Sequence, residues 1–233
     1  MRKRNVVALV AVAAEAYGAL TYLGLTWGAT RQERRRSLPG DDIVPDPMLQ
    51  TDHAITIGVP PSDVWPWLVQ MGWGRAGWYT YRWVDKLIFP KNGPSADAIL
   101  PEHQHLAVGD RIPDGAPEAE CFFTVEALVP NKQLVLLSHT HLPPRPRTAC
   151  MDWTWTYALT AMSDGRTRLQ TRTRLRMEPR WLALVYRALI GADFIMGRSH
   201  LLGIKRRAES PHAVAHESSR IAVQEGHAMS VGH

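Results

Sequence analysis

The residues with the plainest capacity for chemistry are histidines, which occur twice in pairs two positions apart. One pair is His103 and His105, and the other is His139 and His141. On a β-strand, side chains at i and i+2 point to the same side, so either pair could present two imidazoles to one metal ion. No third ligand stands out near either pair, and no CxxC spacing occurs. We therefore expect no metal and no other cofactor.

Two positions could instead offer a polar group to a ligand. His139 and its neighbour Ser138 lie on a predicted strand, and the register of the hairpin decides which of them faces inward. His200 lies on a predicted helix, one turn after Met196. It is either a core or surface histidine whose hydrogen bonds are satisfied, or a hydrogen-bond donor or general acid in a pocket. The sequence alone identifies no catalytic residue.

Tryptophan is concentrated in one short stretch of the chain. These side chains either pack in and around the core, because each indole buries a large apolar area, or form an aromatic wall at the mouth of a cavity. Glycines between them permit a mobile loop, which favours the second interpretation without establishing it. The tryptophans are Trp65, Trp67, Trp73, Trp78 and Trp83, and the glycines are Gly72, Gly74 and Gly77.

Composition and charge restrict the classes of protein to which the chain can belong. Of its 233 residues, 45% are hydrophobic, which is typical of a globular protein and not of a disordered chain. Two cysteines, Cys121 and Cys150, cannot form a disulfide scaffold, and the sequence does not show whether they are bridged. The net charge of +5 includes basic runs at 2–4, 34–36 and 205–207, of which the first two flank an apolar segment. This arrangement suits a membrane surface, and we expect no nucleic-acid partner.

The apolar segment runs from Val6 to Thr26 with Glu15 as its only charge, and it is long enough to cross a bilayer. Insertion is favoured only weakly, because a charged residue near the centre costs ~3 kcal/mol. A secretory signal cleaved near residue 16 and a soluble or interfacial helix are the alternatives. The apolar run continues past that site, so we predict a single-pass cell-membrane anchor over residues 1–27. Basic residues flank the segment on both sides, so their distribution does not determine which side of the membrane carries the domain.

The elements that would position these residues begin after a linker. Residues 28–50 are rich in charge and proline, which indicates that linker. Alternating apolar residues predict a strand over 53–59, and Ser62 is placed to cap a helix over 63–71. A second short helix over 78–89 is expected before a stretch that is mostly loop.

Period-two alternation then predicts two antiparallel hairpins with strands over 121–128, 134–141, 151–161 and 166–177. Arginines at 168, 172, 174 and 176 share one face of the last strand, which we expect to point towards water. A long helix over 180–209 follows Pro179, and residues 209–233 have the composition of a disordered tail. The helix carries an apolar stripe, the feature by which helices pack on a core. The stripe consists of Trp181, Leu184, Val185, Ala188, Leu189, Ala192, Ile195, Met196, Ser199 and Leu202.

This order of elements resembles the helix-grip fold of the START-like superfamily, also called SRPBCC, over residues 51–208. The clearest cue is HAITIGVPPSDVWPWL at 53–68, which looks like the first strand and helix start of that superfamily. LAVGD at 106–110 and the two hairpins fit as well. A closer resemblance, to a bacterial subgroup with an N-terminal hydrophobic helix, rests on WGAT at 27–30 and LPGD at 38–41. The resemblance implies an α+β domain in which a curved antiparallel sheet wraps around a long C-terminal helix and encloses a cavity.

The resemblance implies function less sharply than fold, because START-like proteins include carriers, cyclases and regulators. No catalytic motif of the cyclases matches this chain. Our first hypothesis is a membrane-tethered binding or carrier protein for a hydrophobic small molecule, lipid-like or polycyclic. A polyketide cyclase or dehydratase and a membrane interaction module with a vestigial cavity are the alternatives. The expected ligand-binding residues are Trp78, Tyr81, Phe123, Val125, His139, Trp155, Thr173, Met196 and His200.

Overall fold

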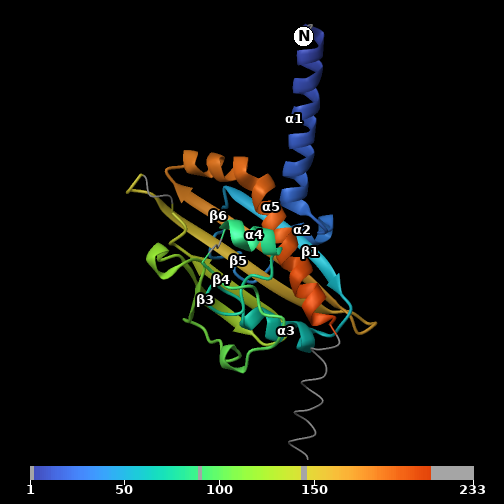
Figure 1. Ribbon diagram of the computed structural model, residues 1–233, viewed down its shortest axis with the longest axis vertical. Coiled ribbons are helices and arrows are strands. Elements are labelled where there is room, and N and C mark those ends of the chain that lie inside the picture. Colours follow the sequence, from blue (N-terminus) through green and yellow to red (C-terminus); the bar gives the residue numbers. More distant parts are fainter. Residues whose placement is uncertain (1–2, 89–90, 143–145, 211–233) are drawn as a thin grey trace, which may run out of the picture.

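The computed structural model describes residues 3–88, 91–142 and 146–210 (Figure 1). Its strands are β1 (Leu49–Ile57), β2 (Arg111–Pro113), β3 (Phe122–Val129), β4 (Gln133–Ser138), β5 (Cys150–Ala161) and β6 (Thr167–Glu178). They form one antiparallel sheet of six strands in the order β1-β6-β5-β4-β3-β2. The helices are α1 (Lys3–Thr26), α2 (Arg31–Arg35), α3 (Pro61–Val69), α4 (Arg82–Ile88) and α5 (Trp181–Ala208), with single 3-10 turns at Pro101–His103 and Pro117–Ala119.

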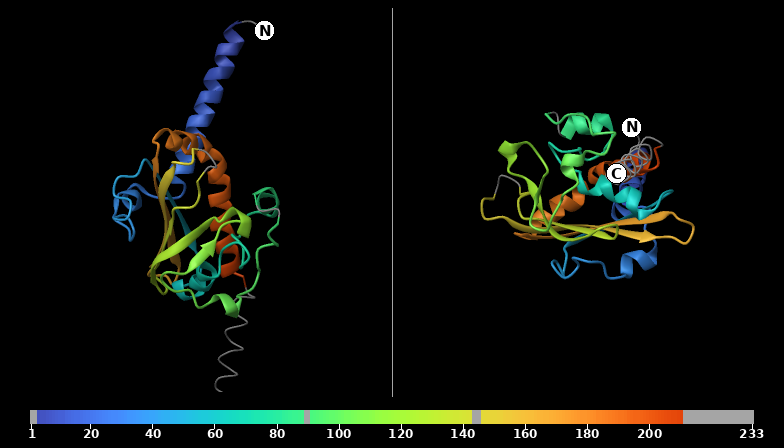
Figure 2. Two further views of the ribbon diagram at one scale, coloured as in Figure 1. Left: turned by 90° about the vertical axis from the view of Figure 1, so that its left-hand side faces the viewer. Right: turned by 90° about the horizontal axis from the view of Figure 1, so that it is seen from below.

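The curved sheet separates two layers of the molecule. Helices α3, α4 and α5 lie on one face, and the chain between α1 and β1 lies on the other (Figure 2). The class is therefore α+β, with an antiparallel sheet and a long C-terminal helix that crosses it, as the sequence predicted. Of the disordered tail predicted over 209–233, the part from residue 211 onward lies outside the described residues.

The hairpin of β5 and β6 shows how local sequence produces the sheet. Both strands lie within a residue of their predicted bounds, and they pair without interruption from Cys150 opposite Glu178 to Ala161 opposite Thr167. The turn between them uses Gly165 at φ +82, a conformation that glycine adopts without strain. Cys150 and Cys121, whose pairing the sequence left open, are both free thiols.

Two apolar clusters pack between the sheet and α5. The larger one joins Leu201 and Ile204 of α5 to Trp67 of α3 and Tyr157 of β5. The smaller one lies under the first half of α5 and joins Leu182 and Ile190 to the ends of β1, β5 and β6. Each cluster anchors one half of the helix to the sheet.

The predicted apolar stripe of α5 is wrong in the first half of the helix. Trp181, Leu184, Val185 and Leu189 are between 45% and 68% exposed. The side chains that pack towards the sheet and α1 in this half are instead Leu182, Ala183, Ile190 and Phe194, which are all buried. Because this part of α5 is apolar on two sides, the spacing of its hydrophobic residues does not tell which side faces the core.

Helix α1 is fixed to the body of the protein only by its last turns. A Cβ on Gly24 would lie 2.9 Å from the Ile190 carbonyl oxygen, and one on Gly191 would lie 2.7 Å from Leu20, so small residues on both helices permit close packing. His53 of β1 also bonds the Gly24 carbonyl at 2.6 Å. The rest of α1 stands away from the body (Figure 1).

By length and mean hydropathy, none of the helices in the described ranges qualifies to cross a membrane. The single-pass anchor expected over residues 1–27 stays a prediction.

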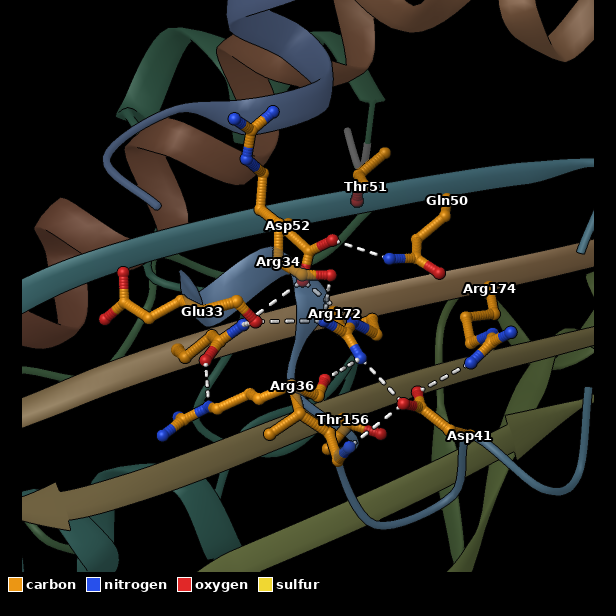
Figure 3. A network of polar contacts seen from close by, with 12 residues as sticks. Glu33, Arg34, Arg36, Asp41, Gln50, Thr51, Asp52, Thr156, Arg172 and Arg174 are labelled. Atoms are coloured by element: carbon orange, nitrogen blue, oxygen red, sulfur yellow. Dashed lines mark hydrogen bonds and ion pairs between the residues drawn. The ribbon is translucent and has the colours of Figure 1, made fainter. Parts of the chain in front are cut away.

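We expected the arginines of β6 to point towards water, and this is correct for Arg176, whose side chain is 51% exposed, but wrong for Arg172. Arg172 of β6 is only 3% exposed. Its guanidinium pairs with Asp52 of β1 at 2.8 Å and with Asp41 at 2.6 Å (Figure 3). It also donates to the main-chain carbonyl oxygens of residues 33, 34 and 36. The segment predicted as a linker therefore packs against the sheet around one buried cation.

Removal of this cation should destabilise the whole domain. Arg172→Ala leaves the Asp52 carboxylate buried without its ion pair, and the loss of one partner of a buried pair costs ~3–5 kcal/mol. Urea denaturation followed by tryptophan fluorescence measures the change in the free energy of unfolding. Arg166→Ala is the control, because Arg166 forms an exposed pair with Asp164 in the β5–β6 turn. Equal losses of stability in the two variants would contradict the role given to Arg172.

Candidate ligand-binding site

A cavity of about 290 Å³ lies between the sheet and the first half of α5. Its walls come from β1, β5, β6 and α5, and they are mostly apolar. The polar groups among them are two threonine hydroxyls, one tyrosine hydroxyl and one carboxyl. The lining residues are Leu49, Thr51, Trp153, Thr173, Leu175, Tyr186, Leu189, Ile190, Asp193 and Met196.

A smaller cavity of about 30 Å³ continues the first one towards the middle of α5. The two share Thr51, Trp153, Thr173, Asp193 and Met196 as walls. The smaller one is also lined by His53, Trp155 and His200. Its size suits a bound water or the end of a ligand held mainly in the larger cavity.

Asp193 stands where the two cavities meet. Its side chain is exposed to solvent on one side, and it belongs to the walls of both cavities. Burial of the carboxyl among protein atoms raises its pKa to about 6, and the negative charge of Asp114 adds to the effect. Within the described ranges, no hydrogen bond or ion pair satisfies this carboxylate. At pH 7 it is mostly ionised, without a partner, beside apolar walls.

His200 is fully engaged in hydrogen bonds below the smaller cavity. Its Nδ1 lies 2.5 Å from the Trp78 carbonyl oxygen, which can only accept, so Nδ1 carries the proton. Its Nε2 then accepts from the Tyr157 hydroxyl at 2.9 Å. Burial lowers the pKa of His200 to about 4, so the ring is neutral near pH 7. Of the two interpretations of His200 given above, its contacts agree with a histidine whose hydrogen bonds are satisfied. Its ring still forms part of the wall of the smaller cavity.

The inner face also holds a chain of Ser138, His141 and Asp114. Ser138 Oγ lies 2.6 Å from His141 Nδ1, and His141 Nε2 lies 2.8 Å from Asp114 Oδ2. The residue types are those of a hydrolase, but the Ser138 hydroxyl is buried and accepts a hydrogen bond from the Thr140 amide at 3.1 Å. Neither cavity is lined by Ser138. A buried hydroxyl that accepts an amide hydrogen bond is not an available nucleophile. We therefore assign a structural role to this series of hydrogen bonds.

The sequence-predicted site residues fall into three groups in the structure. Trp155, Thr173, Met196 and His200 border the cavities. Three more, Trp78, Phe123 and Val125, lie in the buried core. Trp78 stacks there on Trp155, with 5.6 Å between the ring centres.

The remaining two lie elsewhere. Tyr81 borders a separate depression beside Arg206 and Arg207. The His139 side chain is 61% exposed and pairs with Asp152 at 3.1 Å. His139 does not meet His141 at a common metal position, and within the described residues no group of three His, Cys, Asp or Glu side chains could hold a metal ion. The binding role of all nine residues stays a prediction.

Comparison with known proteins gives likeness in fold without a family. No protein-family model matches the chain, and no curated protein does. Among solved structures, protein MLL2253 from Mesorhizobium loti is 18% identical with a TM-score of 0.42, over 68% of this chain and 95% of that one. The Aha1 dimer from Colwellia psychrerythraea is 16% identical with a TM-score of 0.35, over 68% and 99%. CalU16 from Micromonospora echinospora is 15% identical with a TM-score of 0.33, over 72% and 88%. Likeness at this level carries no argument about function.

Sequence reasoning missed Asp193, which is the most polar group of the larger cavity. The residue lies one turn after Leu189 and one turn before Met196 on α5. A carboxyl between apolar positions at helical spacing is the signal that could have revealed it, because an acidic side chain at such a position lies beside apolar neighbours. The misplaced stripe on α5 concealed this position.

The low pKa of His200 makes stability depend on pH. The unfolded chain binds a proton at this histidine below pH 6.5, and the folded protein binds it only near pH 4. The free energy of unfolding should therefore fall by up to ~3 kcal/mol as pH drops through this range. His200→Gln can still donate to the Trp78 carbonyl and accept from Tyr157, and it should lose this dependence. Urea denaturation of both proteins between pH 4 and 7 measures this pH dependence. His105→Gln is the control, because His105 is exposed. Parallel pH profiles for the wild type and His200→Gln would refute the low pKa assigned to His200.

Proposed function

We propose that this protein binds or carries a hydrophobic small molecule, lipid-like or polycyclic, in the larger cavity between the sheet and α5. The single observation that carries the proposal is a formed cavity of about 290 Å³ with mostly apolar walls. This volume is close to the lower end of the usual range of ligand sites, ~300–1,000 Å³. Burial of apolar ligand surface, worth ~25 cal/mol per Å² before ordering costs, would supply most of the affinity.

The same proposal includes membership of the START-like superfamily. Its support is the resemblance of the sequence over residues 51–208 together with the antiparallel sheet crossed by a long C-terminal helix. The resemblance implies a cavity between the sheet and the helix, and a cavity between the sheet and α5 supports this part of the proposal.

A cyclase or dehydratase is the second candidate, and Asp193 is the observation that favours it. A carboxyl with a pKa of about 6 in an apolar cavity is suited to general acid–base work. The other polar groups near the cavities are already occupied: His200 by Trp78 and Tyr157, and Tyr186 by the His141 carbonyl oxygen at 2.7 Å. One free group is sufficient to orient a ligand but gives no acid–base pair, so we favour binding.

A polar substitution in the cavity wall tests the binding proposal. Leu189→Gln places an amide in the apolar wall. It should weaken binding of a neutral hydrophobic fluorescent probe, such as N-phenyl-1-naphthylamine, about tenfold, because a polar group that loses water costs ~1–3 kcal/mol. Leu184→Gln is the matched control, since Leu184 is exposed on the same helix outside the cavity. Titration of probe fluorescence measures both. Absence of probe binding to the wild type, or equal effects of the two variants, would count against the proposal.

We further propose that the domain loads its ligand at a membrane. The exposed apolar residues of α5, Trp181, Leu184, Val185 and Leu189, follow the spacing of one helix face, and Leu189 is also a wall of the cavity. Arg180, directly before α5, and Arg187 in its first half are exposed, and basic side chains of this kind attract an interfacial helix to anionic lipid. Helix α1 rises from the end of the body where this half of α5 lies (Figure 1), with Val12, Tyr17 and Tyr22 exposed along it.

Lipid vesicles test the membrane proposal through a matched pair of tryptophans. Trp181 on α5 is 53% exposed, and Trp83 is 57% exposed on a different helix, α4. Trp181→Ala should weaken partition onto vesicles of phosphatidylcholine and phosphatidylglycerol about tenfold, whereas Trp83→Ala should have little effect. Co-sedimentation with the vesicles measures partition. If Trp83→Ala weakens partition as much as Trp181→Ala, α5 is not the membrane-facing element.

A further inference from the structure

The larger cavity contains one ionised group and nothing to balance it. Asp193 reaches it from α5, and no lysine or arginine is among the described residues that line either cavity. The charged side chain that acts on the pKa of Asp193 is Asp114, which is also acidic and is hydrogen-bonded to His141. His200 and His53 border the smaller cavity, and burial lowers the pKa of both, so neither supplies a positive charge near pH 7. The ionised side chain that lines the larger cavity is therefore an acid, with no basic side chain among the described lining residues.

A carboxylate without a protein partner beside apolar walls is available to pair with a charged ligand. The Asp193 side chain is exposed and lines both cavities, so a cation held by the apolar walls would reach its oxygens. The charge of Asp193 favours ligands that bring a positive charge. It disfavours fatty acids and other anions, because their carboxylates would meet Asp193 with the same sign.

The other walls around Asp193 suit an ammonium group. Trp153 and Tyr186 line the same cavity, and aromatic faces attract cations, tryptophan most strongly. The hydroxyls of Thr51 and Thr173 lie 2.7 Å apart in the cavity wall and can accept hydrogen bonds from an N–H group. Leu49, Leu175 and Ile190 complete an apolar region for the rest of the molecule.

We propose that the ligand of this cavity is a hydrophobic amine, and that the Asp193 carboxylate pairs with its protonated nitrogen while the leucine and isoleucine walls hold its apolar body. This inference rests on the proposed function, because it names the chemical class of the molecule that the cavity binds. It assigns to Asp193 a role in binding and specificity and requires no reaction.

Three probes with one chain and different head groups test the inference on the full-length protein. Decylamine, decan-1-ol and decanoate are titrated calorimetrically at pH 7.5, where the amine is protonated and Asp193 is ionised. Decylamine should bind about tenfold or more tighter than decan-1-ol, the effect of a charge-assisted hydrogen bond, and decanoate should bind weakest. Asp193→Asn should remove the preference for decylamine and leave the affinity for decan-1-ol within about threefold.

The controls separate the possible failures. Asp46→Asn removes an exposed carboxylate on the other side of the sheet and should leave all three affinities unchanged, which excludes an effect of net charge. Asp193→Leu repeats the loss of preference with a variant that cannot form polar contacts. If decan-1-ol or decanoate binds the wild type as tightly as decylamine, or if Asp193→Asn keeps the preference, the amine inference is overturned while cavity binding stands. If none of the three binds, the proposed function fails and the inference fails with it.

Discussion

The guanidinium of Arg172 is the constraint around which the outer layer is arranged. A cation that is 3% exposed must have its donors satisfied, and this one draws on Asp52 from the neighbouring strand and Asp41 and three carbonyl groups from the segment before β1. Those contacts hold β1 in register with β6 and fix residues 33–41 against the sheet. Because the outer face is closed in this way, the inner face does not have to provide all of the stability, and it can keep a cavity without loss of the fold.

Different parts of α5 have different roles on the inner face of the sheet. Apolar clusters at the two ends hold the helix on the sheet, and the cavities lie near the middle, where Asp193 and His200 project towards β1, β5 and β6. His200 shows how a polar group is tolerated in such a position, since both ring nitrogens are bonded. Asp193 lies two turns earlier on the helix and has no such partners. On one helix, the polar residue with partners has a structural role, and the one without partners is the residue to which we assign the proposed binding role.

The sequence predicted the elements that depend on local pattern better than those that depend on the choice of face. Strands β5 and β6 were placed within a residue because the alternation of apolar and polar residues along each strand is a local signal. The stripe of α5 was wrong because Leu184 and Leu189 on one side compete with Leu182 and Ile190 on the other, and only tertiary packing selects between them. Arg172 was predicted to point towards water for a related reason. The segment that covers it has no periodic pattern from which its packing against the sheet could be predicted. Of the expected ligand-binding residues, Trp155, Thr173, Met196 and His200 border the cavities, whereas Asp193 was missed together with the correct face of the helix.

The two apolar sides of α5 connect the proposed ligand site to the proposed membrane surface. Leu189 contributes to the cavity wall and is 56% exposed, so one side chain belongs to both. An amphiphile that leaves a bilayer beside α5 would have a short path to the cavity, with its apolar body never fully exposed to water. A cationic head group would be retained at an anionic lipid surface and would then exchange lipid phosphate for the Asp193 carboxylate, so that the charge stays paired at both ends of the transfer. A ligand without this charge would gain the apolar burial but would leave Asp193 unpaired, and this difference in free energy is what would give the site its selectivity.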